Sequence, residues 1–175
     1  MPKYFAKISD GHIEKVKEYL ALHMRHTFPG SSATAAVLED ATASRGKMIR
    51  PRLLLMVSAY GPDYREARER LYKLAAITEM THLASLIHDD VVDDAPFRRG
   101  KPSVQGKYGK NAAVYAGDFL MSRLCYYCMR EELNQSGMVL AKAVEEMCGG
   151  EIGQAMCRYK TDVTMDDYLR NIHGK

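Results

Sequence analysis

The segment Leu86-Ile-His-Asp-Asp-Val-Val-Asp-Asp94 decides how the rest of the chain is interpreted, because it gathers four aspartates at the end of a long stretch of helical apolar spacing. On a helix, residues four apart lie on one face, so Asp89 shares a face with Asp93 and Asp90 shares one with Asp94. Carboxylate pairs at that spacing suit Mg2+, which usually keeps coordination sites for water and substrate phosphates. The segment therefore predicts a helix that ends in a magnesium site.

The position of these acids at a helix C-terminus strengthens that interpretation. An acidic cluster is commonly no more than a solvated helix end, but the helix macrodipole disfavours carboxylates at the C-terminus and favours cations there. A basic segment, Arg98-Arg-Gly-Lys-Pro102, follows directly and supplies hydrogen-bond donors for an anion. Acidic and basic segments in succession predict a site for a metal ion and a diphosphate.

Composition places the chain among ordinary globular proteins. Its 175 residues are 46% hydrophobic and 27% charged, which suits one domain with a sizeable core. The net charge of +3 is too small to favour nucleic acid or an anionic membrane as a partner. No apolar run approaches the roughly 18 residues of a membrane-spanning helix, and the N-terminus lacks the apolar core of a secretory signal. We therefore expect a cytoplasmic protein.

Apolar periodicity predicts an all-α chain. The segment 9–26 is expected to be amphipathic, with Ile13, Val16, Leu20 and Met24 on its apolar face. Further helices are expected at about 33–43, 51–61, 64–92, 111–130, 135–159 and from Asp166 onward.

Three local details of these elements are also predicted. Residues 53–57 are expected to be buried, and residues 95–109, with two prolines and three glycines, are expected to form a loop. Thr164 and Asp167 form a capping-box pattern for the last helix, with Asp where Glu is usual. The buried face of the helix over 64–92 is expected to comprise Leu71, Leu74, Ile77 or Thr78, Thr81, Ala84, Ser85 and His88.

Two further signals bear on phosphate binding, and each is weak alone. Gly46-Lys-Met-Ile-Arg50 places two cations three residues apart, a spacing that suits a diphosphate, although most such pairs are surface charge. His82 precedes Asp89 by two helical turns and shares its face, although a lone helical histidine is more often structural. The CxxC of Cys125 and Cys128 lies within a helical pattern without a second pair, so buried apolar cysteines are favoured.

Taken together, these segments resemble the trans-isoprenyl diphosphate synthase, or polyprenyl synthetase, family. Five segments in the family's order carry the resemblance: Gly46-Lys-Met-Ile-Arg-Pro51, His82–Asp94 with its DDxxD motif, Arg98-Arg-Gly-Lys-Pro102, Ala116-Gly-Asp-Phe-Leu120 and Gly150-Glu-Ile-Gly-Gln154. Arg45 and Met48 depart from the family's usual Gly-Gly-Lys-Arg pattern, whereas Lys47 and Arg50 match it.

The resemblance implies an orthogonal helical bundle of the isoprenoid synthase type, normally a homodimer, and an Mg2+-dependent 1'-4 condensation of isopentenyl diphosphate with an allylic diphosphate. Catalysis would rest on Asp89 and Asp93, which would hold Mg2+, with Asp90 in support. Isopentenyl diphosphate would be bound by Lys47, Arg50, His82 and Arg99. The allylic diphosphate would be bound by Arg98 and Lys175, with Gln154 on the cavity wall.

The resemblance also implies a determinant of product length in front of the DDxxD motif. Ala84 and Ser85 occupy the positions where bulky aromatic residues stop chain growth in the family, and both are small. The cavity would then continue toward Thr81 and Met80, which favours a product longer than farnesyl diphosphate. Small residues at these positions also serve ordinary helix packing.

The resemblance leaves the family's second Asp-rich motif unmatched. Asp162, Asp166 and Asp167 lie in a capping region and do not form it. We therefore expect residues 1–175 to be the N-terminal part of a single polyprenyl synthetase domain, inactive alone and prone to self-association.

Two other classes of protein remain open. One is a non-catalytic subunit of a heteromeric prenyl synthase, against which the intact Asp89, Asp93 and Arg98-Arg99 argue. The other is a terpene cyclase, which would explain the aspartates but not the second set of cations at Lys47 and Arg50.

Overall fold

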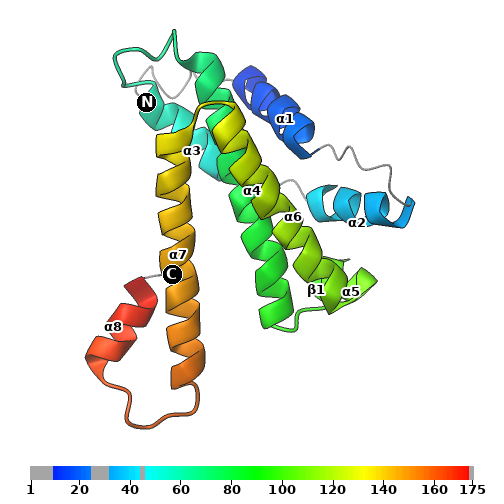
Figure 1. Cartoon of the computed structure of the whole chain (residues 1–175), viewed down its shortest axis with the longest axis vertical. Helices are drawn as coiled ribbons and strands as arrows, with labels where there is room; N and C mark the ends of the chain where they lie inside the picture. Colours follow the sequence, from blue (N-terminus) through cyan, green and yellow to red (C-terminus); the bar gives the residue numbers. More distant parts are fainter. Residues whose placement is uncertain (1–9, 25–31, 44–45, 174–175) are drawn as a thin grey trace. The chain divides into compact units, whose positions relative to one another are not determined.

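A computed structural model describes residues 10–24, 32–43 and 46–173 (Figure 1). Within these ranges the chain is helical apart from one short β-ribbon, as expected for an all-α protein. The helices are α1 (Asp10–Met24), α2 (Ser32–Ala43), α3 (Ile49–Ser58), α4 (Arg68–Val92), α5 (Val104–Tyr108), α6 (Lys110–Arg130), α7 (Asn134–Cys157) and α8 (Met165–His173). The chain divides after Leu133 into two compact units. Among the described helices, none combines the length and apolar character that crossing a bilayer requires.

Helix α4 forms the centre of the first unit. Helices α1, α3 and α6 all pack against it, and α6 runs along its length (Figure 1). The predicted apolar face of α4 is only partly right: Ile77 and Ala84 are fully buried, whereas Leu71, Leu74, Thr81, Ser85 and His88 are half-buried. The buried residues centre instead on another side of the helix, where they recur every three or four positions from Tyr72 to Asp90. They include Tyr72, Ala75, Ala76, Glu79, Met80, Leu83, Ile87 and Asp90.

Helix α1 agrees closely with the sequence prediction. Its expected apolar residues, Ile13, Val16, Leu20 and Met24, are all buried. His23 is buried on the same helix, and its ring stacks on Tyr127 of α6 with centroids 3.9 Å apart. The apolar stripe predicts α1 correctly because its large apolar residues coincide with the face that packs on α3, α4 and α6.

The prediction for α3 needs correction. The helix begins two residues before Pro51, and the expected buried run of residues 53–57 is wrong, because Leu53 and Val57 are exposed. Pro51 and Leu55 are the buried residues of this helix. Met48 precedes α3 in the left-handed region with φ 54° and its side chain is buried, which fixes the turn between Lys47 and Arg50.

Two boundaries around α4 also differ from the prediction. The helix begins at Arg68 rather than near Tyr64, because residues 61–67 form consecutive turns in which the Ala67 N–H donates to the Asp63 carbonyl at 2.9 Å. The expected loop over 95–109 contains an antiparallel ribbon of β1 (Phe97–Arg98) and β2 (Lys101–Pro102), followed by α5.

The ribbon has an identifiable cause in its two-residue turn. Arg99 and Gly100 both have positive φ, 52° and 77°, the combination that a tight hairpin turn requires. Ser103 then caps α5, because its side chain accepts a hydrogen bond from the Gly106 N–H at 3.1 Å. The turn therefore presents Arg98 and Arg99 next to α4.

The second unit consists of α7 and α8 packed on one another. The predicted capping box is confirmed: the Asp167 N–H donates to Thr164 Oγ1, and the Thr164 N–H donates to Asp167 Oδ2, both at 3.1 Å. Gly153 allows the close packing, because a Cβ there would overlap Asn171 of α8.

Candidate functional site

A cavity of about 580 Å³ lies in the first unit between α2, α4, the β-ribbon and α5. The middle and C-terminal part of α4 forms one wall, and the ribbon with α5 forms the opposite wall. The lining residues are Asp40, Ala41, Ala43, Gly46, Glu79, His82, Leu83, Leu86, Ile87, Asp90, Arg98, Arg99, Lys101, Pro102, Ser103, Val104, Lys107 and Tyr108. The α4 wall thus combines apolar residues with Glu79, His82 and Asp90, whereas the ribbon wall is basic.

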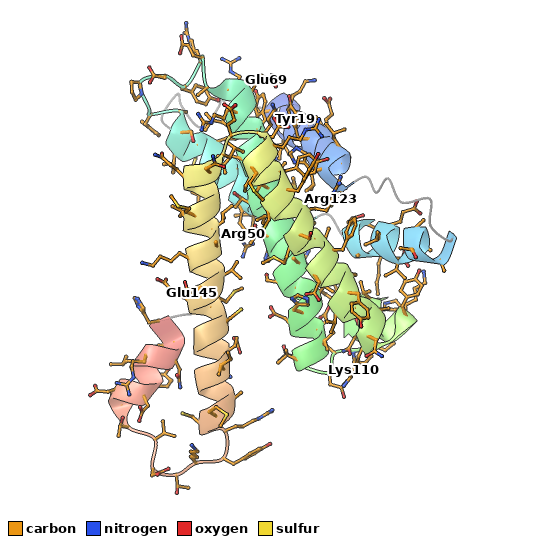
Figure 2. The ribbon with its side chains drawn as sticks, in the orientation of Figure 1. Tyr19, Arg50, Glu69, Lys110, Arg123 and Glu145 are labelled. Carbon is orange, nitrogen blue, oxygen red and sulfur yellow. The ribbon has the colours of Figure 1, made fainter. Side chains whose placement is uncertain are left out.

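The basic side of the cavity brings together residues from three separate predicted motifs. Arg98 and Arg99 come from the ribbon, His82 comes from α4, and Gly46 lies so close to Arg99 that an added Cβ would be 3.5 Å from Nη1. Arg50, near the start of α3, extends beside α4 (Figure 2). The structure therefore brings His82 near Arg50 and Arg99, whose charges make these three residues a cationic cluster. Arg50 is not part of the cavity wall, and exposed Lys47 follows Gly46 in the chain.

His82 is uncharged at neutral pH in this cluster. Burial lowers the pKa of His82, and the positive charges of Arg50, Arg99 and Arg98 lower the pKa further. A neutral imidazole donates a hydrogen bond from one ring nitrogen only. An arriving polyanion would offset the arginine charges and favour protonation of His82.

The aspartates of the central motif separate into two environments. Asp89 and Asp93 are exposed, while Asp90 is 5% exposed and faces the cavity. Asp90 Oδ1 accepts hydrogen bonds from Arg98 Nε at 2.8 Å and Nη2 at 2.7 Å, and this contact raises the pKa of Arg98. Gln105 donates to the Asp90 backbone carbonyl. Asp90 therefore fixes the direction of Arg98.

The exposed pair suits a magnesium ion in its chemistry. Asp89 and Asp93 are one helical turn apart, and the Asp93 N–H donates to the Asp89 carbonyl at 2.8 Å where α4 ends. The described part of the chain has no group of three or more His, Cys, Asp or Glu side chains arranged to hold a metal. Magnesium is commonly held by only one or two carboxylates together with substrate phosphates, and Asp89 with Asp93 fits that donor set.

The remaining predicted residues lie outside the cavity wall or outside the described chain. Lys175 is outside the described residues, and Gln154 is exposed on α7 in the second unit. Met80 and Ala84 are fully buried in the packing of α4, whereas Thr81 and Ser85 are half-buried and follow the helical row that leads to Asp89. The roles predicted for these residues remain predictions.

Sequence reasoning missed several polar residues of the cavity. Glu79 is the most notable, because it is 4% exposed and lines the cavity one helical turn before His82. Its spacing from His82 was the available signal. At the other wall, Asp40 of α2 accepts hydrogen bonds from Lys107 and, at 2.6 Å, from the Tyr108 hydroxyl, which ties α2 to α5. This second contact joins residues more than sixty positions apart, and no local pattern predicts it.

Comparison with known proteins assigns the chain to a family. A family model described as polyprenyl synthetase matches residues 31–175. The chain belongs to the polyprenyl synthetase family. This agrees with the resemblance seen in the sequence motifs.

Relatives in this family include long-chain synthases. The chain is 38% identical over 130 residues to heptaprenyl diphosphate synthase component 2 of Geobacillus stearothermophilus, covering 74% of this chain and 40% of that protein. It is 36% identical over 151 residues to a prenyl transferase of Synechocystis sp., covering 86% of this chain and 45% of that one.

Solved structures of the family share the fold. A polyprenyl synthase from Caulobacter crescentus, complexed with calcium and isoprenyl diphosphate, matches with a TM-score of 0.81 and 28% identity, covering 98% of this chain and 51% of that one. The heptaprenyl diphosphate synthase of Staphylococcus aureus matches with a TM-score of 0.80 and 28% identity, covering 95% and 51%. The predicted isoprenoid synthase fold is confirmed, and the chain spans about half the length of these solved chains.

Proposed function

We propose that this chain supplies the isopentenyl diphosphate site and the first metal site of a trans-polyprenyl diphosphate synthase. The observation that carries the proposal is the cationic cluster of His82, Arg50 and Arg99 beside a cavity whose α4 wall extends from Glu79 to Asp90. Membership of the polyprenyl synthetase family supports it.

In the proposed mechanism the two arginines and the histidine bind and orient isopentenyl diphosphate. Arg50 and Arg99 neutralise diphosphate oxygens, exposed Lys47 adds charge, and His82, which is neutral in the free chain, donates a hydrogen bond. These groups hold the diphosphate so that the isopentenyl double bond faces the allylic substrate. Their contribution is to position the substrate, and no side-chain nucleophile is needed.

The allylic diphosphate would be bound at the C-terminal end of α4. Asp89 and Asp93 would hold Mg2+, which when bound would neutralise charge developing on the departing diphosphate. Arg98, kept in place by Asp90, would donate to the same leaving group. We further propose Lys175 and Gln154 as contributors to allylic diphosphate binding, on the family resemblance alone.

Product length is proposed to exceed that of farnesyl diphosphate. Relatives named as heptaprenyl and solanesyl diphosphate synthases support this proposal. Thr81 and Ser85 do not line the described cavity, but they lie on the half-buried row of α4 that leads to Asp89, and we propose that a growing chain passes along this row. Larger residues there would be expected to shorten the product.

A second candidate is that the chain acts as one component of a heteromeric synthase. Two relatives, from Geobacillus stearothermophilus and Bacillus subtilis, carry the name component 2, which favours this possibility. Self-association and association with a different chain are distinguished by co-purification: a stoichiometric second chain supports the heteromeric form, and a single species supports the homomeric form.

An elongation assay tests the proposed reaction. The chain is incubated with Mg2+, isopentenyl diphosphate and farnesyl diphosphate, and prenyl diphosphates are analysed by mass spectrometry. Because we propose that the chain is the first part of one catalytic domain, we expect no elongation by residues 1–175 alone. We expect elongation when the chain is fused to the C-terminal portion of its Synechocystis relative, which is named as a prenyl transferase and not as one component of a synthase. A folded fusion that binds farnesyl diphosphate but makes no longer product contradicts the proposal.

A further inference from the structure

Helix α5, which forms part of the cavity wall, is fixed to the end of α4 by several contacts. The Ser103 hydroxyl donates to the Ala95 carbonyl at 2.7 Å, and the Ser103 N–H donates to the Pro96 carbonyl at 2.9 Å. Gly106 lies so close to this segment that an added Cβ would be 2.1 Å from the Pro96 carbonyl oxygen. The α5 wall is therefore held in place independently of α2.

Helix α2 lines the same cavity but has little apolar surface to hold it there. It contributes Asp40, Ala41 and Ala43 to the lining. Five of its 12 residues are alanine, and of residues 33–43 only Leu38 and Ala41 are buried. Alanine buries little apolar area, and an isolated helix of this length is marginal in water. The position of α2 therefore depends on its contacts with neighbouring elements.

Asp40 attaches α2 to α5. Its Oδ2 accepts hydrogen bonds from the Tyr108 hydroxyl at 2.6 Å and from Lys107 Nζ, and Nζ lies 5.0 Å from the centre of the Tyr108 ring. The side chains of Asp40 and Lys107 are 40% and 53% exposed, and exposed ion pairs contribute little. Tyr108 is half-buried, so its hydroxyl is the stronger partner. All three residues line the cavity, and their contact closes it where α2 meets α5.

The interior of the cavity is largely closed while α2 is in place. Ala41 of α2 and Leu83 and Ile87 of α4 line it, and all three are buried. A ligand that reaches these residues must therefore displace a wall. Helix α4 is packed along α6 and α5 is fixed to the end of α4, which leaves α2 as the wall that can move.

We propose that α2 is a movable wall of this cavity and that Asp40 is the latch that holds it closed against Tyr108 and Lys107. When the latch opens, α2 separates from α5 and a ligand enters or leaves on that side. His82 and Arg99 border the same cavity, so opening of α2 should set how long isopentenyl diphosphate remains bound. This last consequence rests on the proposed function, whereas the latch itself does not.

Amide hydrogen exchange of the ligand-free 175-residue chain tests the latch. Tyr108→Phe keeps the ring and removes the hydroxyl, and Asp40→Asn removes the charge. Both are expected to accelerate exchange of the amides of residues 36–43 roughly tenfold, after correction for local sequence, and to leave α6 unchanged. Glu39→Gln is the matched control, because Glu39 is the exposed neighbour of Asp40 on α2 and loses the same charge.

Two results of this experiment would overturn the proposal. One is exchange of residues 36–43 at the same rate in Asp40→Asn, Tyr108→Phe and Glu39→Gln. The other is an equal acceleration in α2 and α6, because that would show general destabilisation of the first unit and not release of one wall.

A second measurement tests whether the latch controls the ligand. Dissociation of isopentenyl diphosphate is expected to be roughly tenfold faster in Asp40→Asn and Tyr108→Phe than in the unmodified chain, and unchanged in Glu39→Gln. Faster exchange in α2 with unchanged dissociation would overturn the role of α2 as the movable wall. Failure of the unmodified, folded chain to bind isopentenyl diphosphate contradicts the proposed function, and the exchange experiment still decides whether Asp40 holds α2 closed.

Discussion

Asp90 and Asp93 lie three residues apart in one motif, but they have different surroundings and therefore different roles. Asp90 is buried and bonded to Arg98, while Asp93 is exposed at the end of α4. The sequence predicted the acidic motif but not this separation, because helical spacing groups residues by face and does not say which face meets the ribbon. The pairing of Asp90 with Arg98 depends on the Arg99-Gly100 turn, whose positive φ angles place Arg98 next to α4.

Substitution of Asp90 is expected to destabilise the first unit more than substitution of Asp93. Asp90→Asn removes the charge that satisfies Arg98, and we expect a loss of about 2 kcal/mol in the free energy of unfolding. Asp93→Asn removes an exposed charge and should change it by less than about 0.5 kcal/mol. Urea denaturation in magnesium-free buffer measures both. Equal effects would contradict the positioning role assigned to Asp90.

His82 is expected to take up a proton when a diphosphate binds. Its pKa in the free chain is lowered below the ordinary 6.5, and a bound polyanion would raise it. Affinity for isopentenyl diphosphate should therefore increase as the pH falls from the pKa of His82 in the complex toward its lower pKa in the free chain. Calorimetry at about pH 6 in buffers of different ionisation enthalpy measures the uptake. His82→Asn retains a hydrogen-bond donor without the titration, and equal proton uptake by this variant would rule out His82 as the source.

At the scale of elements, the sequence predicted helices well and their partners poorly. The predicted apolar residues of α1 are all buried. The buried side of α4 contains alanines and the acids Glu79 and Asp90, so large apolar residues did not reveal it. The ribbon and α5 were missed because glycine and proline indicate a loop, and only the paired positive φ values at Arg99 and Gly100 create the turn. The cavity depends on that turn, so its wall could not be predicted from helical patterns.

The capping box at the start of α8 provides a test of local sequence chemistry. Thr164→Ala removes the hydroxyl that accepts from the Asp167 N–H, and we expect the local stability of α8 to fall by about 1 kcal/mol. Faster amide exchange within Met165–His173 would show this loss. Thr161→Ala is the control, because Thr161 is exposed and lies outside the capping box. Unchanged exchange in Thr164→Ala would mean that the cap contributes nothing to α8.

At the scale of the whole molecule, acid should weaken the first unit through His23. Burial lowers the pKa of His23 to about 4, and its Nδ1 has no hydrogen-bond partner in the described chain. The unfolded chain binds the proton near pH 6.5 but the folded chain does not. Stability is therefore full above that pH and is lost as the pH falls toward 4, by about 3 kcal/mol in all.

Comparison with His23→Phe isolates this effect from the acids that also titrate in that range. The variant keeps an aromatic ring against Tyr127 and lacks the ionisation. Urea denaturation at several pH values should give a shallower loss of stability for the variant. An equal loss of stability with falling pH in both proteins would contradict the assignment of this effect to His23.

The family and fold followed from motifs in order along the chain, and the comparisons confirm both. The roles of individual residues are proposals, and they depend on whether the cationic cluster binds a diphosphate. The most direct measurement is calorimetric titration of residues 1–175 with isopentenyl diphosphate. We expect one saturable site whose affinity for isopentenyl diphosphate falls more than roughly tenfold in Arg50→Ala/Arg99→Ala. Affinity should be retained in the charge-matched variant Arg65→Ala/Lys160→Ala, whose substituted side chains are exposed. No saturable binding by the folded chain, or equal affinity in the two double variants, would contradict it.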